Sequence, residues 1–175
     1  MIERILLAVD GSDTAQRATD LAAELAVNLN ADLFIVHVLM HGRPSRELVH
    51  MAEVEHLVRE AHSATSPKSA YVPGSYPELL GGDATDARTA RIISALGEQI
   101  VARAKTRCAE LGAGTVETSV LAGDYADEIL EAAREHDVDI LVIGSRGLGV
   151  LKSTLLGSVS QKVLHHADCS VVIVR

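Results

Sequence analysis

Two short glycine-rich pieces near the end of the chain hold the residues best suited to binding chemistry. The first runs from Gly144 to Gly149 (GSRGLG), and the second, seven residues later, runs from Gly157 to Ser160 (GSVS). Three glycines in six positions let a backbone turn sharply and approach a ligand without interference from Cβ atoms. The first piece therefore predicts either a ligand-binding turn or a turn that serves only the fold.

The second piece has the features of a phosphate site. Gly157 and Ser158 stand where a helix is expected to begin, and the free N–H groups and positive dipole end of a helix start suit an anion. Ser158 and Ser160 add hydroxyl donors, and Arg146 in the first piece adds a cation, unless its side chain simply points to solvent. No Gly-Lys-Ser/Thr sequence occurs, and the spacing is not the dinucleotide fingerprint, so neither of those phosphate loops is predicted.

Alternating strand and helix patterns must position these two pieces. Continuous apolar runs predict buried strands, and apolar residues at helical spacing predict helices between them. This alternation is typical of an α/β fold made of βαβ units with a parallel sheet of five strands. Strands are expected over residues 2–9, 31–39, 115–121, 138–143 and 170–174, and helices over 14–29, 124–136 and 158–167. Asp124 is a candidate N-cap of the helix over 124–136.

One connection is much longer than a crossover helix requires. Residues 40–114 contain a helical pattern over 45–64, a Pro-, Ser- and Gly-rich stretch over 63–85, and a second helical pattern over 86–111. The apolar content of this region is too low for a separate core. We therefore predict one domain over residues 1–175 with a long helical and loop insertion at about 40–85.

Composition limits the functional classes. The formal net charge of −8 argues against general binding to nucleic acid or to anionic membranes, because both require a basic surface. Two cysteines without a shared motif favour a reducing compartment, and neither a signal peptide nor a membrane-length apolar run is recognisable. We therefore expect a cytoplasmic protein without membrane insertion. Cys169 is expected in the core, whereas the place of Cys108 near a helix end leaves a surface position open.

The glycine pieces resemble the nucleotide-binding pattern of the universal stress proteins. The pattern is Gly144, two residues, Gly147, nine residues, and then Gly157 with Ser158. The sequence ILLAVDGS over residues 5–12, the His-Val pair at 37–38 and Gly123 before a predicted helix also resemble that family. The resemblance implies a doubly wound, Rossmann-like domain with helices on both faces of the sheet, and binding of ATP with Mg²⁺. The insertion is longer than usual, and Ser170 stands where the family usually has proline.

The resemblance also implies the site residues. Ala8, Val9 and Asp10 would lie beside the adenosine, and Val38 would offer backbone atoms to the adenine edge. The residues along the ribose and phosphates would be Gly144, Arg146 and Gly147, followed by Gly157, Ser158, Val159 and Ser160. Asp10 fits independently, since a carboxylate at a strand's carboxyl end can accept from ribose hydroxyls or help to hold a metal. An alternative role for Asp10 is to cap the first helix, shared with Ser12 or Asp13.

The function favoured at this stage is that of an ATP-binding stress-response regulator. Its nucleotide state would modulate assembly or the binding of an unidentified protein partner, and a homodimer or larger assembly would form through the apolar strand at 171–174. The alternative is a slow Mg²⁺-dependent ATPase on the same fold. No catalytic triad, paired carboxylates or metal-ligand spacing is apparent, and adenylation is disfavoured because its signature loops are missing. A family member with an inactive pocket is a third possibility.

Overall fold

The computed structural model describes residues 1–40, 84–148 and 156–175; for Met40 and residues 84–90 it describes the backbone alone. Most of the predicted insertion, including the helical pattern over 45–64, lies outside the described residues. Every predicted element on described residues is present, with ends that agree to within two residues. The strands are β1 (Arg4–Ala8), β2 (Asp32–Met40), β3 (Val116–Gly123), β4 (Ile140–Gly144) and β5 (Ser170–Val174). The helices are α1 (Asp13–Leu29), α4 (Ala84–Glu110), α5 (Tyr125–Glu135) and α6 (Ser158–His166).

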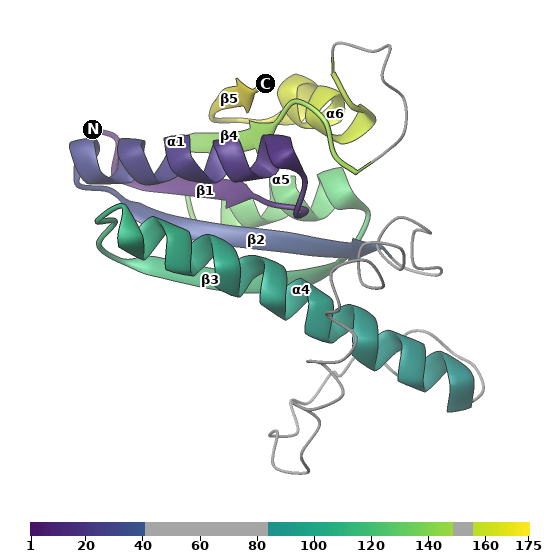
Figure 1. Cartoon of the computed structure of the whole chain (residues 1–175). Coiled ribbons are helices and arrows are strands. Elements are labelled where there is room, and N and C mark those ends of the chain that lie inside the picture. Colours follow the sequence, from purple (N-terminus) through teal and green to yellow (C-terminus); the bar gives the residue numbers. More distant parts are fainter. Residues whose placement is uncertain (41–83, 149–155) are drawn as a thin grey trace.

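The five strands form one all-parallel sheet in the order β3-β2-β1-β4-β5. This confirms the predicted α/β class and its doubly wound topology. The chain runs outward from β1 through β2 to β3, and then returns to the other side of β1 to build β4 and β5 (Figure 1). The carboxyl ends of β1 and β4 therefore adjoin at the point where the strand order reverses, which is where open α/β sheets bind ligands.

Each face of the sheet carries its own core. Alternate β1 residues serve opposite faces: Ile5 and Leu7 pack with α1 and α4, and Leu6 and Ala8 pack with α5. Helix α6 covers the same face as α5 (Figure 1). Helix α1 packs on the sheet through alanines, whose small side chains let the helix approach closely, so that no large aromatic side chains are needed to fill the space between them. Its buried alanines are Ala15, Ala18, Ala22, Ala23 and Ala26.

Capping residues fix the ends of the helices that lead away from the carboxyl edge. Ser12 caps α1, and its hydroxyl accepts a hydrogen bond from the backbone N–H of Ala15 at 3.2 Å. Asp124 caps α5, as predicted, by accepting from the N–H groups of Ala126 and Asp127 at 3.1 and 3.2 Å. Among the described helices, none has the length and apolar character needed to cross a membrane.

The structure decides where the two cysteines lie. Cys108, whose surface position the sequence left open, is fully buried on α4, and burial raises the pKa of its thiol to about 11. Cys169 is only half-buried and packs at the margin of the α5/α6 core, where burial raises its pKa. Both thiols therefore stay protonated near neutral pH, which makes them poor nucleophiles.

Candidate functional site

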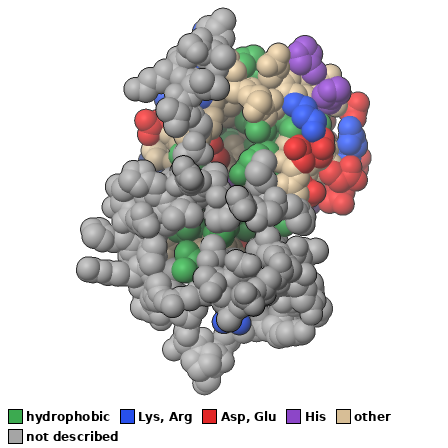
Figure 2. Space-filling view, turned by 90° about the vertical axis from the view of Figure 1, so that its right-hand side faces the viewer, with side chains coloured by type: hydrophobic (Ala, Val, Ile, Leu, Met, Phe, Trp, Pro, Cys, Tyr) green, Lys and Arg blue, Asp and Glu red, His purple; other side chains and the backbone are tan. Residues whose placement is uncertain are grey.

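The candidate site lies at the carboxyl edge of the sheet, which faces the viewer in Figure 2. Hydrophobic side chains are visible in the middle of this face, and acidic and basic side chains lie together at one margin. Three segments meet at this edge: the residues after β1, the turn after β4 and the start of α6.

Asp10 joins the end of β1 to the turn after β4. One carboxylate oxygen accepts from the backbone N–H of Ser12 at 3.0 Å, and the other accepts from the N–H of Leu148 at 3.2 Å. Asp10 does not cap α1, because Ser12 does so. A carboxylate offers about four acceptor positions, so both oxygens can still accept from a ligand hydroxyl.

Gly144 and Gly147 are glycines because protein atoms fill the space of a side chain. A Cβ at Gly147 would lie 2.5 Å from the Asp10 carboxylate oxygen Oδ2. A Cβ at Gly144 would lie 2.7 Å from the hydroxyl of Thr14 and 3.1 Å from its backbone carbonyl carbon. The Thr14 backbone therefore accounts for a glycine at 144 whatever ligand approaches the turn, whereas at Gly147 the crowding atom is the end of the Asp10 side chain.

The start of α1 holds the glycine turn through Arg146. The hydroxyl of Thr14 donates to the Arg146 carbonyl, and the Ser12 hydroxyl lies 3.4 Å from the same oxygen. Sequence reasoning did not assign Thr14 or Ser12 to the site, although both lie within four residues of Asp10. The Arg146 side chain is exposed, and in the described part of the structure its guanidinium makes no hydrogen bond or ion pair.

Ser145 connects the turn to α6 and to the edge strand. Its carbonyl accepts from the Gly157 N–H at 2.8 Å and from the Ser160 hydroxyl at 2.9 Å. Its own N–H donates to the carbonyl of Val174 on β5 at 2.6 Å. The Ser145 side chain is fully buried, and its hydroxyl oxygen has no hydrogen-bond partner. The sequence offered only one signal for this residue, its position between Gly144 and Arg146.

The start of α6 leaves donors available. Gly157 is the N-cap and makes no side-chain capping bond, so the N–H groups of Ser158, Val159 and Ser160 have no acceptor within the helix. A Cβ at Gly157 would meet its nearest described atoms at 3.6 Å, which is ordinary contact. The Ser160 hydroxyl is buried and contacts the carbonyls of Ser145 and Gly157, so this residue offers a ligand its N–H rather than the predicted hydroxyl.

The residues predicted to lie beside the nucleoside divide between the two faces of the sheet. Ala8 packs in the α5/α6 core, and Val9 packs in the α1/α4 core. The β1–β2 register ends with Ala8 opposite Val36, so β2 continues past the end of β1. The Val36 carbonyl accepts from the Val9 N–H at 2.9 Å. Because strands have a two-residue period, Val38 directs its backbone groups toward the same side, beyond the last β1 residue.

His37 is a buried residue of this edge that sequence reasoning did not use. It is 2% exposed, and its Nδ1–H donates to the Val9 carbonyl at 2.8 Å, while Nε2 has no partner. Burial lowers the pKa of His37, and the Val9 bond and the Asp10 charge oppose this only in part. The neutral ring thus fixes the backbone just before Asp10. The only signal in the sequence was the His-Val pair at the end of the predicted strand.

Comparison with known proteins identifies the family of this chain. The model of the universal stress protein family matches residues 1–175. This chain belongs to the universal stress protein family. It is 34% identical over 177 residues to the universal stress protein YxiE of Bacillus subtilis (strain 168), with 100% of both chains covered.

Solved structures of the family share this fold. The universal stress protein UspA from Lactobacillus plantarum has a TM-score of 0.70 at 21% identity, over 99% of this chain and 97% of that one. A universal stress protein solved in complex with cAMP has a TM-score of 0.60 at 25% identity, over 99% of this chain and 97% of that chain.

Proposed function

We propose that this universal stress protein binds ATP at the carboxyl edge of β1 and β4, and that the bound nucleotide regulates its assembly or its contact with a protein partner. The observation that carries the proposal is the open start of α6. Gly157 leaves room there, the following N–H groups are not used by the helix, and Arg146 is exposed in the adjoining turn. Helix dipole, backbone donors and a guanidinium are together suited to a polyphosphate.

The nucleoside would lie between the ends of β1 and β2. Asp10 retains acceptor capacity for ribose hydroxyls, Ala8 supplies an apolar surface, and Val38 offers backbone groups beyond the end of β1. The cAMP complex of the structural relative supports an adenine nucleotide as the ligand class. Mg²⁺ would enter with ATP, since this ion is usually held by phosphates and retained waters.

The link from nucleotide to assembly would run through Ser145. Its carbonyl holds the Gly157 N–H at the proposed phosphate site, and its N–H holds Val174 of β5. In the described sheet β5 pairs only with β4, so its other edge is available to a second strand. We propose a homodimer or larger assembly through this edge, with closed two-fold symmetry as the commonest arrangement.

Calorimetric titration of the full chain tests the nucleotide. ATP with Mg²⁺ is expected to bind more tightly than AMP, because only ATP reaches the whole α6 start, and more tightly than NAD or FMN. Absence of ATP binding at millimolar ligand would refute the proposal. Release of phosphate over hours in the same samples would instead identify a slow ATPase that uses this site.

Paired proline variants test the edge strand. Ser170 donates to Asp139, and Val174 accepts from Ser145, so even-numbered β5 residues direct their backbone toward the β4 side. Val171 directs its backbone the other way. We expect Val171→Pro to remain folded and to sediment as a monomer at tens of micromolar, whereas Val172→Pro disrupts the β4 pairing and the fold. A monomeric wild-type chain at that concentration would contradict the assembly.

A further inference from the structure

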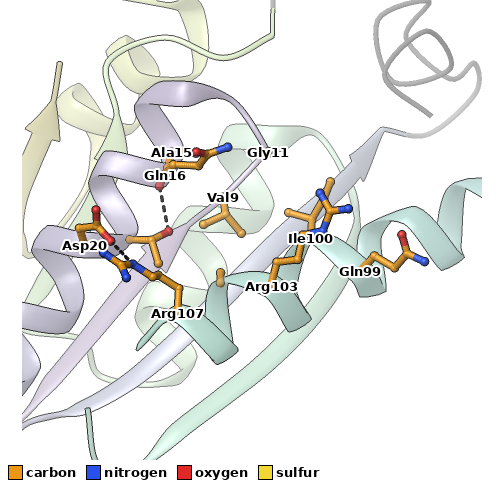
Figure 3. A pocket seen from close by; sticks show the side chains of 11 residues that line it. Val9, Gly11, Ala15, Gln16, Asp20, Gln99, Ile100, Arg103 and Arg107 are labelled. Carbon is orange, nitrogen blue, oxygen red and sulfur yellow. Dashed lines mark hydrogen bonds and ion pairs between the residues drawn. The ribbon is translucent and has the colours of Figure 1, made fainter. Parts of the chain in front are cut away.

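A pocket of about 420 Å³ lies between α1 and α4, against the end of β1. It is on the opposite face of the sheet from Ala8 and α6, because Val9 and Ile100 line it and both belong to the α1/α4 core. Figure 3 shows Val9 between the two helices, with the Asp20–Arg107 pair at one end and Gln99 at the other. This volume is within the range of small-ligand sites.

Small residues create the hollow. Ala15 on α1 and Ala104 on α4 line the pocket, where larger side chains would fill the space between the two helices. Together with Val9 and Ile100 they form an apolar floor, and all four side chains are at least nine-tenths buried. Such a floor suits the hydrocarbon or aromatic body of a ligand rather than a sugar or a free phosphate.

The walls are polar and carry two guanidinium groups. On α4, Gln99, Arg103 and Arg107 follow one another at intervals of four residues and so line one face of the helix. Arg107 is held by Asp20 at 2.7 Å and by Glu110 at 3.6 Å. Arg103 supplies a second guanidinium one turn away, and its five N–H donors allow a ligand contact beside any that it already makes. The wall thus favours a compact anion such as a carboxylate.

Gln99 adds an independent indication of a ligand. Its side-chain oxygen Oε1 is buried and has no hydrogen-bond partner in the part of the chain that the structure describes, although the residue lines the pocket. A buried acceptor without a donor is unfavourable, and native structures rarely leave one unsatisfied. Because Oε1 is itself closed to solvent, the Gln99 amide would have to rotate toward the pocket before a ligand hydroxyl or N–H could satisfy it.

We infer that the α1/α4 pocket is a second ligand site, which takes a small amphipathic carboxylic acid with an apolar body and one hydroxyl or N–H donor. The carboxylate lies toward Arg103, the donor toward Gln99, and the apolar body on Val9, Ile100 and the two alanines. The pocket adjoins the proposed ATP site without coinciding with it: Val9 and Gly11, on either side of Asp10, line the pocket, whereas Ala8 and α6 lie on the other face of the sheet.

The full chain titrated with 6-hydroxy-2-naphthoate, whose hydroxyl and carboxylate lie at opposite ends of the ring system, tests this inference by fluorescence and calorimetry. We expect saturable binding in the micromolar range and at least tenfold weaker binding of 2-naphthol, which lacks the carboxylate. Arg103→Gln should remove that preference, and Ala104→Leu should fill the hollow and abolish binding of both compounds. Arg146→Gln, in the proposed ATP site, is the control and should leave naphthoate binding unchanged.

Three results would overturn the inference: no naphthoate binding at millimolar concentration, naphthoate affinity unchanged in Arg103→Gln, or displacement of naphthoate by saturating ATP. The third would assign the probe to the nucleotide site. Binding of naphthoate in the absence of nucleotide is measured directly, so failure of ATP to bind leaves this test intact. If Ala104→Leu does not fold, the Arg103→Gln comparison alone decides the matter.

Discussion

The two halves of the carboxyl edge differ in whether protein atoms already bond their polar groups and fill the space beside them. The closed half comprises Asp10, Ser12, Thr14, Gly144 and Gly147, where both Asp10 oxygens accept backbone N–H groups and side chains fill the glycine positions. The open half comprises the Arg146 side chain, Gly157, Ser158 and Val159, where donors and room remain. Similar residue types thus serve the fold in one half and are left for a ligand in the other.

This contrast separates stability from binding. A substitution in the closed half disturbs contacts that exist without ligand, so the free energy of unfolding should fall. A substitution in the open half disturbs only what a ligand would touch, so affinity should fall while stability holds. The variants below test whether stability and affinity change separately in this way.

The largest effect is expected for Gly157→Val. The Val side chain would occupy the space before the α6 N–H groups, and ATP affinity should fall by at least about 100-fold, equivalent to about 2.7 kcal/mol. The unfolding free energy should change by no more than about 1 kcal/mol, because valine is only a poorer N-cap than glycine. Calorimetry and urea denaturation measure the two quantities. Normal ATP binding by this variant would contradict the placement of the phosphates.

Gly144→Ala should lower stability instead. Its Cβ would press on the Thr14 backbone at 3.1 Å, which cannot yield as a flexible side chain does. We expect a loss of about 1–3 kcal/mol in the free energy of unfolding, as for other overpacked sites. Gly114→Ala is the matched control, since no described atom lies within 4 Å of a Cβ there. Equal stability of the two variants would show that the closed half is not tightly packed.

Arg146→Ala should weaken ATP binding by roughly tenfold to a hundredfold, because a charge-assisted contact is worth about 1.5–3 kcal/mol. AMP should be affected much less, since it lacks the distal phosphates. Only the side chain is removed, so the carbonyl that Thr14 and Ser12 hold stays in place. Equal losses for ATP and AMP would assign Arg146 to the loop or the nucleoside, and no loss would mean that its side chain faces solvent in the complex.

The smallest effect is expected for His37, which supports the closed half through its hydrogen bond to the Val9 carbonyl. Its pKa in the folded state is lowered from 6.5 by burial, so the unfolded chain takes up a proton first as the pH falls. The contribution of neutral His37 to stability is complete above pH 6.5 and is lost below it, by at most about 1.4 kcal/mol per pH unit.

His37→Asn tests this pH dependence. The variant should be less stable than wild type at pH 7.5. Between pH 7.5 and 5, however, the fall in its unfolding free energy should be smaller than the fall for wild type, by about 1 kcal/mol. Urea denaturation at several pH values measures both curves. Parallel curves for the two proteins would show that His37 does not titrate differently on folding.

Local patterns in the sequence predicted the elements well. Apolar runs gave the five strands, and Asp124 was recognised as a cap, because such signals act between residues a few positions apart. The glycine pieces after residue 143 were also visible in the sequence. That the turn after β4 adjoins the switch point was not predicted and follows from the strand order β3-β2-β1-β4-β5.

The roles of particular residues could not be predicted from such local patterns. Gly147 was read as room for a ligand, but Asp10, far away in sequence, fills that space. The Ser160 hydroxyl was read as a phosphate donor, but it contacts the Ser145 carbonyl. Each outcome depends on how β1, β4 and α6 come together, and no local propensity encodes that.

The sequence by itself determined the class of fold, the strand and helix order, and the two glycine pieces with their cation, because these follow from short-range periodicity and residue type. Only the tertiary structure decided which glycines serve packing, which donors stay open, and that α1 and α4 leave a pocket between them. The Asp20–Arg107 pair at one end of that pocket joins residues 87 positions apart. Such contacts form only once the sheet has fixed where each helix lies.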